Sequence, residues 1–119
     1  MSSLFSTVLT PAAYTLPSNQ QFALALGTIT LVNWTSDRSL VFVGLAATGG
    51  NVDGMVVCLS NLNNNVNSLT LAHDSSLASS PVNRFRNAGL GDTVASTGAG
   101  GTWYRYHGVL LRWIQIGGT

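Results

Sequence analysis

Two apolar segments near the middle of the chain give the clearest structural pattern. Residues 40–45 and 55–59 place apolar side chains at successive positions rather than at alternating ones. Such runs are typical of strands that are covered on both faces, so we expect the central strands of a packed β-sandwich, with Phe42 and Val57 deeply buried. The connection between them is rich in Gly, Asn and Asp, and we expect Gly54 to adopt the positive φ of a tight turn.

Shorter strands are expected on both sides of these central segments. Residues 28–34 alternate between two faces, as do residues 69–73, and alternation is typical of half-buried strands. Residues 22–26 have helical propensity but form only one and a half turns before Gly27, so a strand is the better prediction.

The C-terminal third continues the same pattern. We expect a short strand at residues 93–95 and a hairpin around Gly108 that joins residues 103–107 to 109–116. Residues 74–81 are rich in serine and end at a proline, which predicts a long exposed loop. About eight short strands with polar turns and no helix-length periodic segment predict an all-β fold, a single-domain β-sandwich of antiparallel strands.

The chain length of 119 residues fits one domain, and its N-terminal part differs from the rest. Pro11 and Pro17 bracket an irregular segment, so we expect an extended arm at residues 1–17 and the sandwich domain at residues 18–119. A free tail in water would not usefully expose the apolar residues of this arm. We therefore predict that the arm binds a partner through Leu4, Phe5, Val8, Leu9 and Tyr14. The alternative is that the arm covers its own subunit as an edge strand.

The charge composition is unusual. Charged residues make up only 8% of the chain, as five arginines and four aspartates, with no lysine or glutamate, whereas ordinary domains have about a quarter. A surface of this kind resists association poorly, which indicates that much of it is covered in the working state. The net charge of +1 argues against nucleic acid as a partner. Residues 1–7 lack the basic start of a secretion signal, and the longest apolar stretch, residues 22–32, is too short to cross a bilayer, so we expect no membrane partner.

No residue pattern predicts catalysis or a cofactor. His73, Asp74 and Ser75 include the residue types of a hydrolytic triad, but sequence neighbours seldom converge on one reacting atom. Cys58 lies in an apolar run, where an inert buried thiol is expected. The scattered His, Cys and Asp residues have no metal-ligand spacing, and the fragment 51–53 is more typical of a turn than of a calcium site. We expect no enzyme activity, no metal and no cofactor.

Several aromatic residues allow a second interpretation. Exposed aromatic rings on a β-sandwich can stack on sugars, although large aromatics are more often core or subunit contacts. The candidates for such a platform are Trp34, Trp103, Tyr104, Tyr106 and Trp113.

The order of several short motifs resembles that of a known kind of domain. The motifs are Phe42-Val-Gly-Leu, Asp53-Gly54, Leu59-Ser-Asn61, Leu69-Thr-Leu with His73-Asp74, Asn83-Arg-Phe85, and Arg112-Trp113. Together, over about residues 40–116, they resemble a small β-sandwich domain of tailed-phage virions, which occurs in capsid decoration (cement) proteins and in tail-fibre tips. The resemblance implies a jelly-roll-like fold, usually trimeric, with a structural or host-contact task and no catalysis.

Two functions follow as expectations. The first is a virion decoration protein that binds the major capsid protein, or another virion protein, as a homotrimer. The short chain without a long fibrous segment favours this function. The alternative is a tail-fibre or receptor-binding tip that contacts host-surface glycan through the aromatics and the Asn- and Ser-rich loops.

The resemblance also suggests one structural pair. Asp53 and Arg84 both belong to the motifs above, and few other charges exist to satisfy them. A partly buried pair would use the planar fork of arginine, so we predict that the two side chains form an ion pair. The alternative is that each is an ordinary turn residue.

Overall fold

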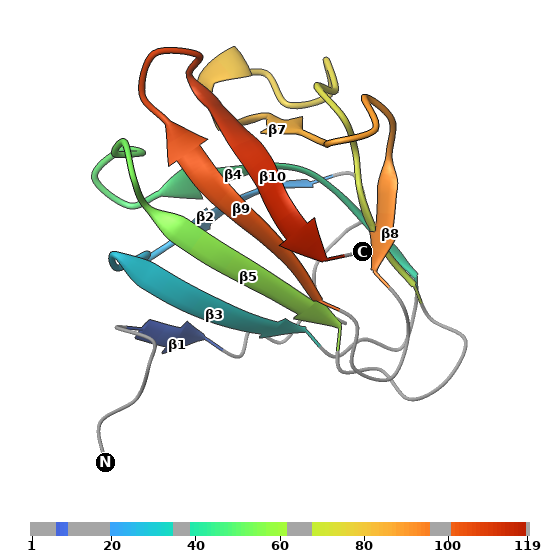
Figure 1. The fold of residues 1–119 in the computed structure, drawn as a ribbon, viewed down its shortest axis with the longest axis horizontal. Helices are drawn as coiled ribbons and strands as arrows, with labels where there is room; N and C mark the ends of the chain where they lie inside the picture. Colours follow the sequence, from blue (N-terminus) through green and yellow to red (C-terminus); the bar gives the residue numbers. More distant parts are fainter. Residues whose placement is uncertain (1–6, 10–19, 35–38, 62–67, 96–100, 119) are drawn as a thin grey trace.

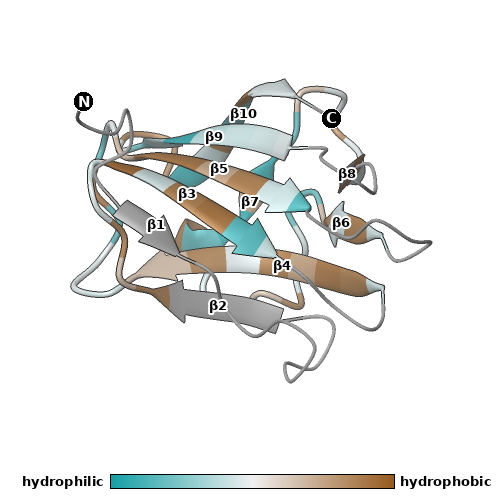
Figure 2. Ribbon diagram, turned by 90° about the horizontal axis from the view of Figure 1, so that it is seen from below, coloured by the Kyte–Doolittle hydropathy of each residue, from teal (hydrophilic) through white to brown (hydrophobic). Residues whose placement is uncertain are grey.

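The computed structural model describes residues 7–9, 20–34, 39–61, 68–95 and 101–118. These residues form ten β-strands and one short 3-10 turn, arranged in two layers (Figures 1 and 2). The elements are β1 (Thr7–Leu9), β2 (Gln20–Leu24), β3 (Ile29–Trp34), β4 (Leu40–Ala47), β5 (Val56–Asn61), β6 (Leu69–Leu71), η2 (Pro81–Asn83), β7 (Phe85–Arg86), β8 (Thr93–Ala95), β9 (Gly101–His107) and β10 (Arg112–Gly118). The all-β, single-domain prediction is confirmed.

The strands form two sheets. One has six strands in the order β1-β3-β5-β9-β10-β7, and the other has four in the order β2-β4-β6-β8. From β1 to β9 the chain changes sheet at every connection, so odd-numbered strands lie in the first sheet and even-numbered strands in the second. Among the described strands, β9 and β10 are the only consecutive pair within one sheet.

The expectation of antiparallel strands is wrong for most of these pairs. Five of the eight described pairings are parallel, including β1 with β3, β3 with β5, β2 with β4 and β4 with β6. From β1 to β6, strands two apart in sequence run the same way, because two reversals between the sheets restore the direction of the chain, whereas β6 and β8 are antiparallel. The jelly-roll-like topology is therefore not confirmed.

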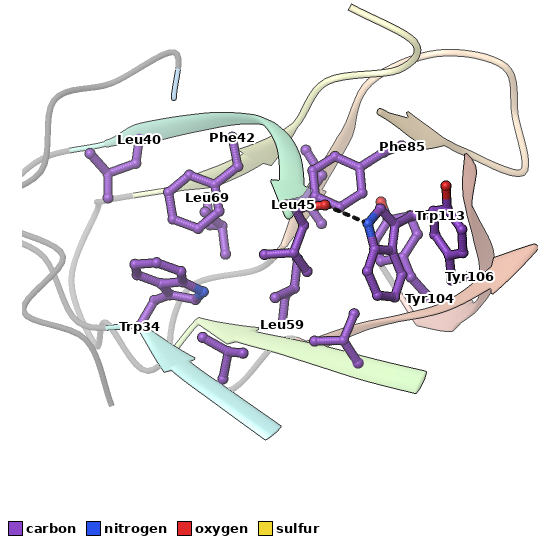
Figure 3. Packing of buried hydrophobic residues seen from close by; sticks show 13 residues of the cluster. Trp34, Leu40, Phe42, Leu45, Leu59, Leu69, Phe85, Tyr104, Tyr106 and Trp113 are labelled. Carbon is purple, nitrogen blue, oxygen red and sulfur yellow. Dashed lines mark hydrogen bonds between the residues drawn. The ribbon is translucent and has the colours of Figure 1, made fainter. Parts of the chain in front are cut away.

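The main core lies between the two layers. Phe42 is 1% exposed and Val57 0%, as predicted from the two central segments. The Trp34 ring packs edge-to-face on Phe42 with centroids 4.2 Å apart. At the other side of the core the Trp113 indole N–H donates to the Leu45 carbonyl at 2.7 Å (Figure 3).

A second, smaller cluster covers the outer face of the four-stranded sheet. It consists of Val43, Ala72 and Ala78, with Val41 packed against it. Since Phe42 belongs to the main core and Val43 to this cluster, β4 is covered on both faces, as its successive apolar residues predicted. The predicted exposed loop at residues 74–81 is corrected at Ala78, which is fully buried because the loop folds back over the sheet.

Several local predictions are confirmed. β3 alternates between half-buried and buried residues, with Thr30, Val32 and Trp34 inward. Gly54 has φ 90° at the turn before β5, and the hairpin around Gly108 pairs β9 with β10. The turn at Gly54 does not join two strands of one sheet, however, because β4 and β5 lie in different layers.

Candidate functional site

The motif His73-Asp74 lies where the second sheet meets β7. The His73 backbone N–H donates to an Asp92 carboxylate oxygen at 2.9 Å. The Nδ1 atom of His73 accepts the Asn87 backbone N–H at 2.9 Å, which places the proton of the neutral ring on Nε2. The nitrogen that a general base would use is therefore bonded to the main chain. Of the three residues considered for a triad, His73 and Asp74 are both used to hold the fold.

Asp74 is the centre of a charged cluster. Its Oδ1 atom lies 3.0 Å from Arg112 Nε and 4.0 Å from Arg84 Nη1. Arg84 Nε also donates to the Ala78 carbonyl at 3.1 Å, and the Arg84 carbonyl accepts the Trp113 backbone N–H at 3.0 Å. The two arginine side chains are about one-fifth exposed, so the cluster is partly buried. Its contacts hold the loop at residues 74–80 against β10.

The structure gives Asp53 and Arg84 other partners than the ones we predicted. Asp53 Oδ1 accepts the Gly108 backbone N–H at 2.7 Å and lies 3.6 Å from Arg105 Nη2. Arg84 instead contacts Asp74. Asp53 belongs to the turn before β5 in the six-stranded sheet, whereas Arg84 lies between η2 and β7. Whether two side chains so far apart in sequence form an ion pair depends on how the strands are arranged in the sheets. The predicted Asp53–Arg84 pair is therefore corrected to two separate ion pairs.

Sequence reasoning missed Asn87, a buried polar residue whose side-chain amide is bonded at both ends. Asn87 is 1% exposed, and its Nδ2 atom donates to the carbonyls of Leu71 at 2.8 Å and Gly91 at 2.9 Å. Its Oδ1 atom accepts the hydroxyl of Tyr104, and burial raises the pKa of the Tyr104 phenol above its ordinary value. Asn87 follows the motif Asn83-Arg-Phe85 by two residues, but nothing in the local sequence distinguishes a buried Asn from a turn Asn.

The aromatic residues do not form an exposed platform. Trp34, Tyr104, Tyr106 and Trp113 are each at most 3% exposed and belong to the main core. Trp103 is half-buried on the opposite face of β9 from Tyr104 and Tyr106.

The remaining candidate chemistry is also used within the fold. Cys58 is a buried free thiol, and burial raises its pKa. Asn51 closes its own loop, accepting the Ala47 N–H and donating to the carbonyls of Leu45 and Val82. Within the residues that the structure describes, no three His, Cys, Asp or Glu side chains gather as a metal site requires, and no pocket is present. None of the helical residues described forms a segment long and apolar enough to cross a membrane.

The predicted partner-binding residues of the arm are only partly placed. Leu4, Phe5 and Tyr14 lie outside the described residues. Val8 and Leu9 belong to β1, which pairs in parallel with Leu31 and Val32 of β3 in the same chain. Over Thr7–Leu9 the arm is thus an edge strand of its own subunit, the alternative that the sequence left open.

One end of the molecule exposes a group of aliphatic side chains, which we call the loop tip. Three segments meet there: the loop between β4 and β5, the turn η2, and the loop between β9 and β10, at the upper left of Figure 1. Hydrogen bonds from Gly108 N–H to Asp53 and from the Tyr106 hydroxyl to the Val82 carbonyl link them. The exposed residues of the loop tip are Val52 (58%), Val82 (40%), Val109 (85%), Leu110 (47%) and Leu111 (44%).

Comparison with known proteins adds no assignment. No protein-family model matches the chain, and searches of curated proteins and of solved structures find no match. The function must be argued from the residues of this chain.

Proposed function

We propose that the protein is a non-catalytic structural subunit of a bacteriophage virion, a decoration (cement) protein that binds and stabilises the capsid lattice as a homotrimer. The observation that supports this most directly is the loop tip, where five aliphatic side chains are exposed at one end of the molecule. Exposed apolar groups that lie together favour a covered, protein-bound state over a free one.

The composition of the chain supports the same proposal. Lysine and glutamate, which keep monomers apart and are depleted from protein interfaces, are absent from all 119 residues. A protein that works within a larger assembly has little need of a strongly charged surface. The partner is the major capsid protein or another virion protein, and three copies are proposed because the domains that the chain resembles are usually trimeric.

The polar motif residues also favour a structural task. His73, Asp74, Arg84 and Arg112 all bond to the chain's own backbone or side chains. Residues fixed in this way stabilise a fold, and a catalytic constellation would instead direct some of them towards a site for substrate. The motifs that gave the resemblance are thus explained by stability.

The alternative is a tail-fibre tip that contacts glycan through aromatic rings together with Asn- and Ser-rich loops. Four of the five candidate rings lie in the core, and Trp103 is half-buried. No specific observation favours a platform of stacked rings.

Location in the particle tests the proposal. We would label an epitope-tagged chain with antibody on intact virions, view it by electron microscopy, and measure the mass of the free protein by light scattering. The proposal predicts label over the capsid facets and the mass of three chains. Label confined to the tail tip would favour the alternative, and virions without label would refute both.

A further inference from the structure

We propose that the loop tip is the docking surface of the protein, and that its occupant is a protein partner with an uncharged, apolar depression. This inference rests on the proposed function, under which the partner is a subunit of the capsid lattice. Its basis is the loop between β9 and β10, in which Val109, Leu110 and Leu111 are consecutive and exposed.

The backbone of this loop is bonded internally at every N–H group. Gly108 donates to Asp53 Oδ1 at 2.7 Å, and Leu111 donates to the His107 carbonyl at 2.8 Å. Val109 and Leu110 both donate to His107 Nδ1, at 3.3 and 3.1 Å. A partner can therefore remove water from the loop without leaving a donor unpaired. The loop is also fixed before binding, which lowers the entropy cost of docking.

Leu111 occupies a backbone conformation that leucine disfavours. Its φ is 55°, in the left-handed region where glycine or asparagine is the ordinary choice. The side chain is 44% exposed, so burial in this subunit does not account for it. Strained residues that gain nothing within their own fold are typical of functional surfaces. Leu90 shares both features away from the loop tip, so the strain at Leu111 supports a docking contact only together with the neighbouring exposed Val109 and Leu110.

The charges around the loop tip indicate which kind of partner fits. Arg105 lies 3.6 Å from Asp53, and Arg84 and Arg112 lie 4.0 and 3.0 Å from Asp74. These arginines are thus paired within the chain, whereas binding to anionic lipid or to nucleic acid uses cations that are free to meet phosphates. An apolar centre with a polar rim of both signs is the usual composition of a protein interface.

A second copy of the chain is a poorer match in shape. The loop tip protrudes, with Val109 85% exposed, and needs a concave receiver. The described residues of this chain form no pocket that could receive it. We therefore take a different protein as the occupant, and a second copy of the chain is tested by the mass measurement below.

The test uses capsids purified without this chain, full-length protein, and two tip variants, Leu111→Gly and the double variant Val109→Ser with Leu110→Ser. Leu90→Gly is the matched control, because Leu90 also has positive φ (58°) and is 65% exposed, but lies between β7 and β8, away from the tip in Figure 1. We would measure co-sedimentation with capsids, the melting temperature, and the mass of each variant. A parallel arm uses vesicles of equimolar phosphatidylcholine and phosphatidylglycerol.

We expect Leu111→Gly to melt at or above the wild-type temperature, since glycine relieves the backbone strain, and yet to bind capsids at least about tenfold more weakly. The double variant should lose binding likewise, and Leu90→Gly should bind as wild type does. If the wild-type protein binds capsids and both tip variants bind with the same affinity, the docking surface is overturned and the proposed function stands. Wild-type protein that fails to bind would overturn both. Vesicle binding that is lost only in the tip variants would assign the surface to lipid and overturn the inference. An assembly mass that is lost only in the tip variants would assign it to a second copy of the chain and overturn the inference as well.

Discussion

Asn87 shows how single polar residues hold this all-β fold together. Its side chain connects the end of β6, the turn before β8 and the Tyr104 ring on β9, and Asn87 itself is 1% exposed. Both amide hydrogens and the carbonyl oxygen have partners within the protein. A satisfied buried amide of this kind fixes the positions of three segments with one side chain.

We therefore predict that Asn87→Ala lowers the free energy of unfolding by about 3 kcal/mol, because the Leu71 carbonyl and the Tyr104 hydroxyl would be left buried without partners. Urea denaturation followed by fluorescence measures the change. Ser79→Ala, at an exposed position, is the control and should differ from wild type by no more than about 0.5 kcal/mol. An equally small effect of Asn87→Ala would contradict the role assigned to this network.

At the scale of elements, the β9–β10 hairpin closes tightly at its far end. Gly118 has φ 80° and pairs with Thr102, and an added Cβ would collide with the carbonyl oxygen of Gly101. Gly117 lies beside it with open space around its Cα. Position 118 therefore requires glycine, whereas position 117 has room for a side chain.

We predict that Gly118→Ala opens this end of the ladder, so that the amides through which β9 and β10 face each other there exchange with solvent at least about tenfold faster, while the hairpin nearer its turn stays protected. Gly117→Ala is the matched control and should leave these exchange rates nearly unchanged. Hydrogen exchange followed by NMR gives both rates. Equal protection in the two variants would mean that the close approach of Gly118 to Gly101 is not needed.

The elements themselves could be predicted from the sequence, but their partners could not. The alternation of β3 and the successive apolar residues of β4 and β5 report which faces are covered, and these predictions are confirmed. A Gly- and Asn-rich connection, however, suits a hairpin within one sheet as well as a connection between two sheets. The parallel pairing and the partners of Asp53 and Arg84 depend on that choice, so local pattern could not give them. The loop tip was missed because exposure of Val109, Leu110 and Leu111 contradicts their hydrophobicity.

For the whole molecule, the buried Tyr104 gives the free energy of unfolding a defined dependence on pH. Burial raises the pKa of Tyr104, so the unfolded chain, with a tyrosine pKa of about 10, ionises first as pH rises. The stabilisation is complete below pH about 10 and is lost above it, by up to about 1.4 kcal/mol per pH unit. Urea midpoints between neutral pH and about pH 11 should fall accordingly. Tyr104→Phe should be less stable at neutral pH but have a shallower alkaline slope; an unchanged slope would exclude Tyr104 as its source.

The alternation of strands between two sheets also determines how the chain can fold in time. In the described residues only β9 and β10 are neighbours both in sequence and in a sheet, so this hairpin alone can form from local contacts. Every other pairing must first close a loop that contains a strand of the opposite sheet, at a cost in chain entropy. Proteins dominated by such distant pairings fold in about milliseconds to seconds. We expect the β9–β10 hairpin to form first, which means that stable structure begins only after the eight described strands that precede it have been synthesised.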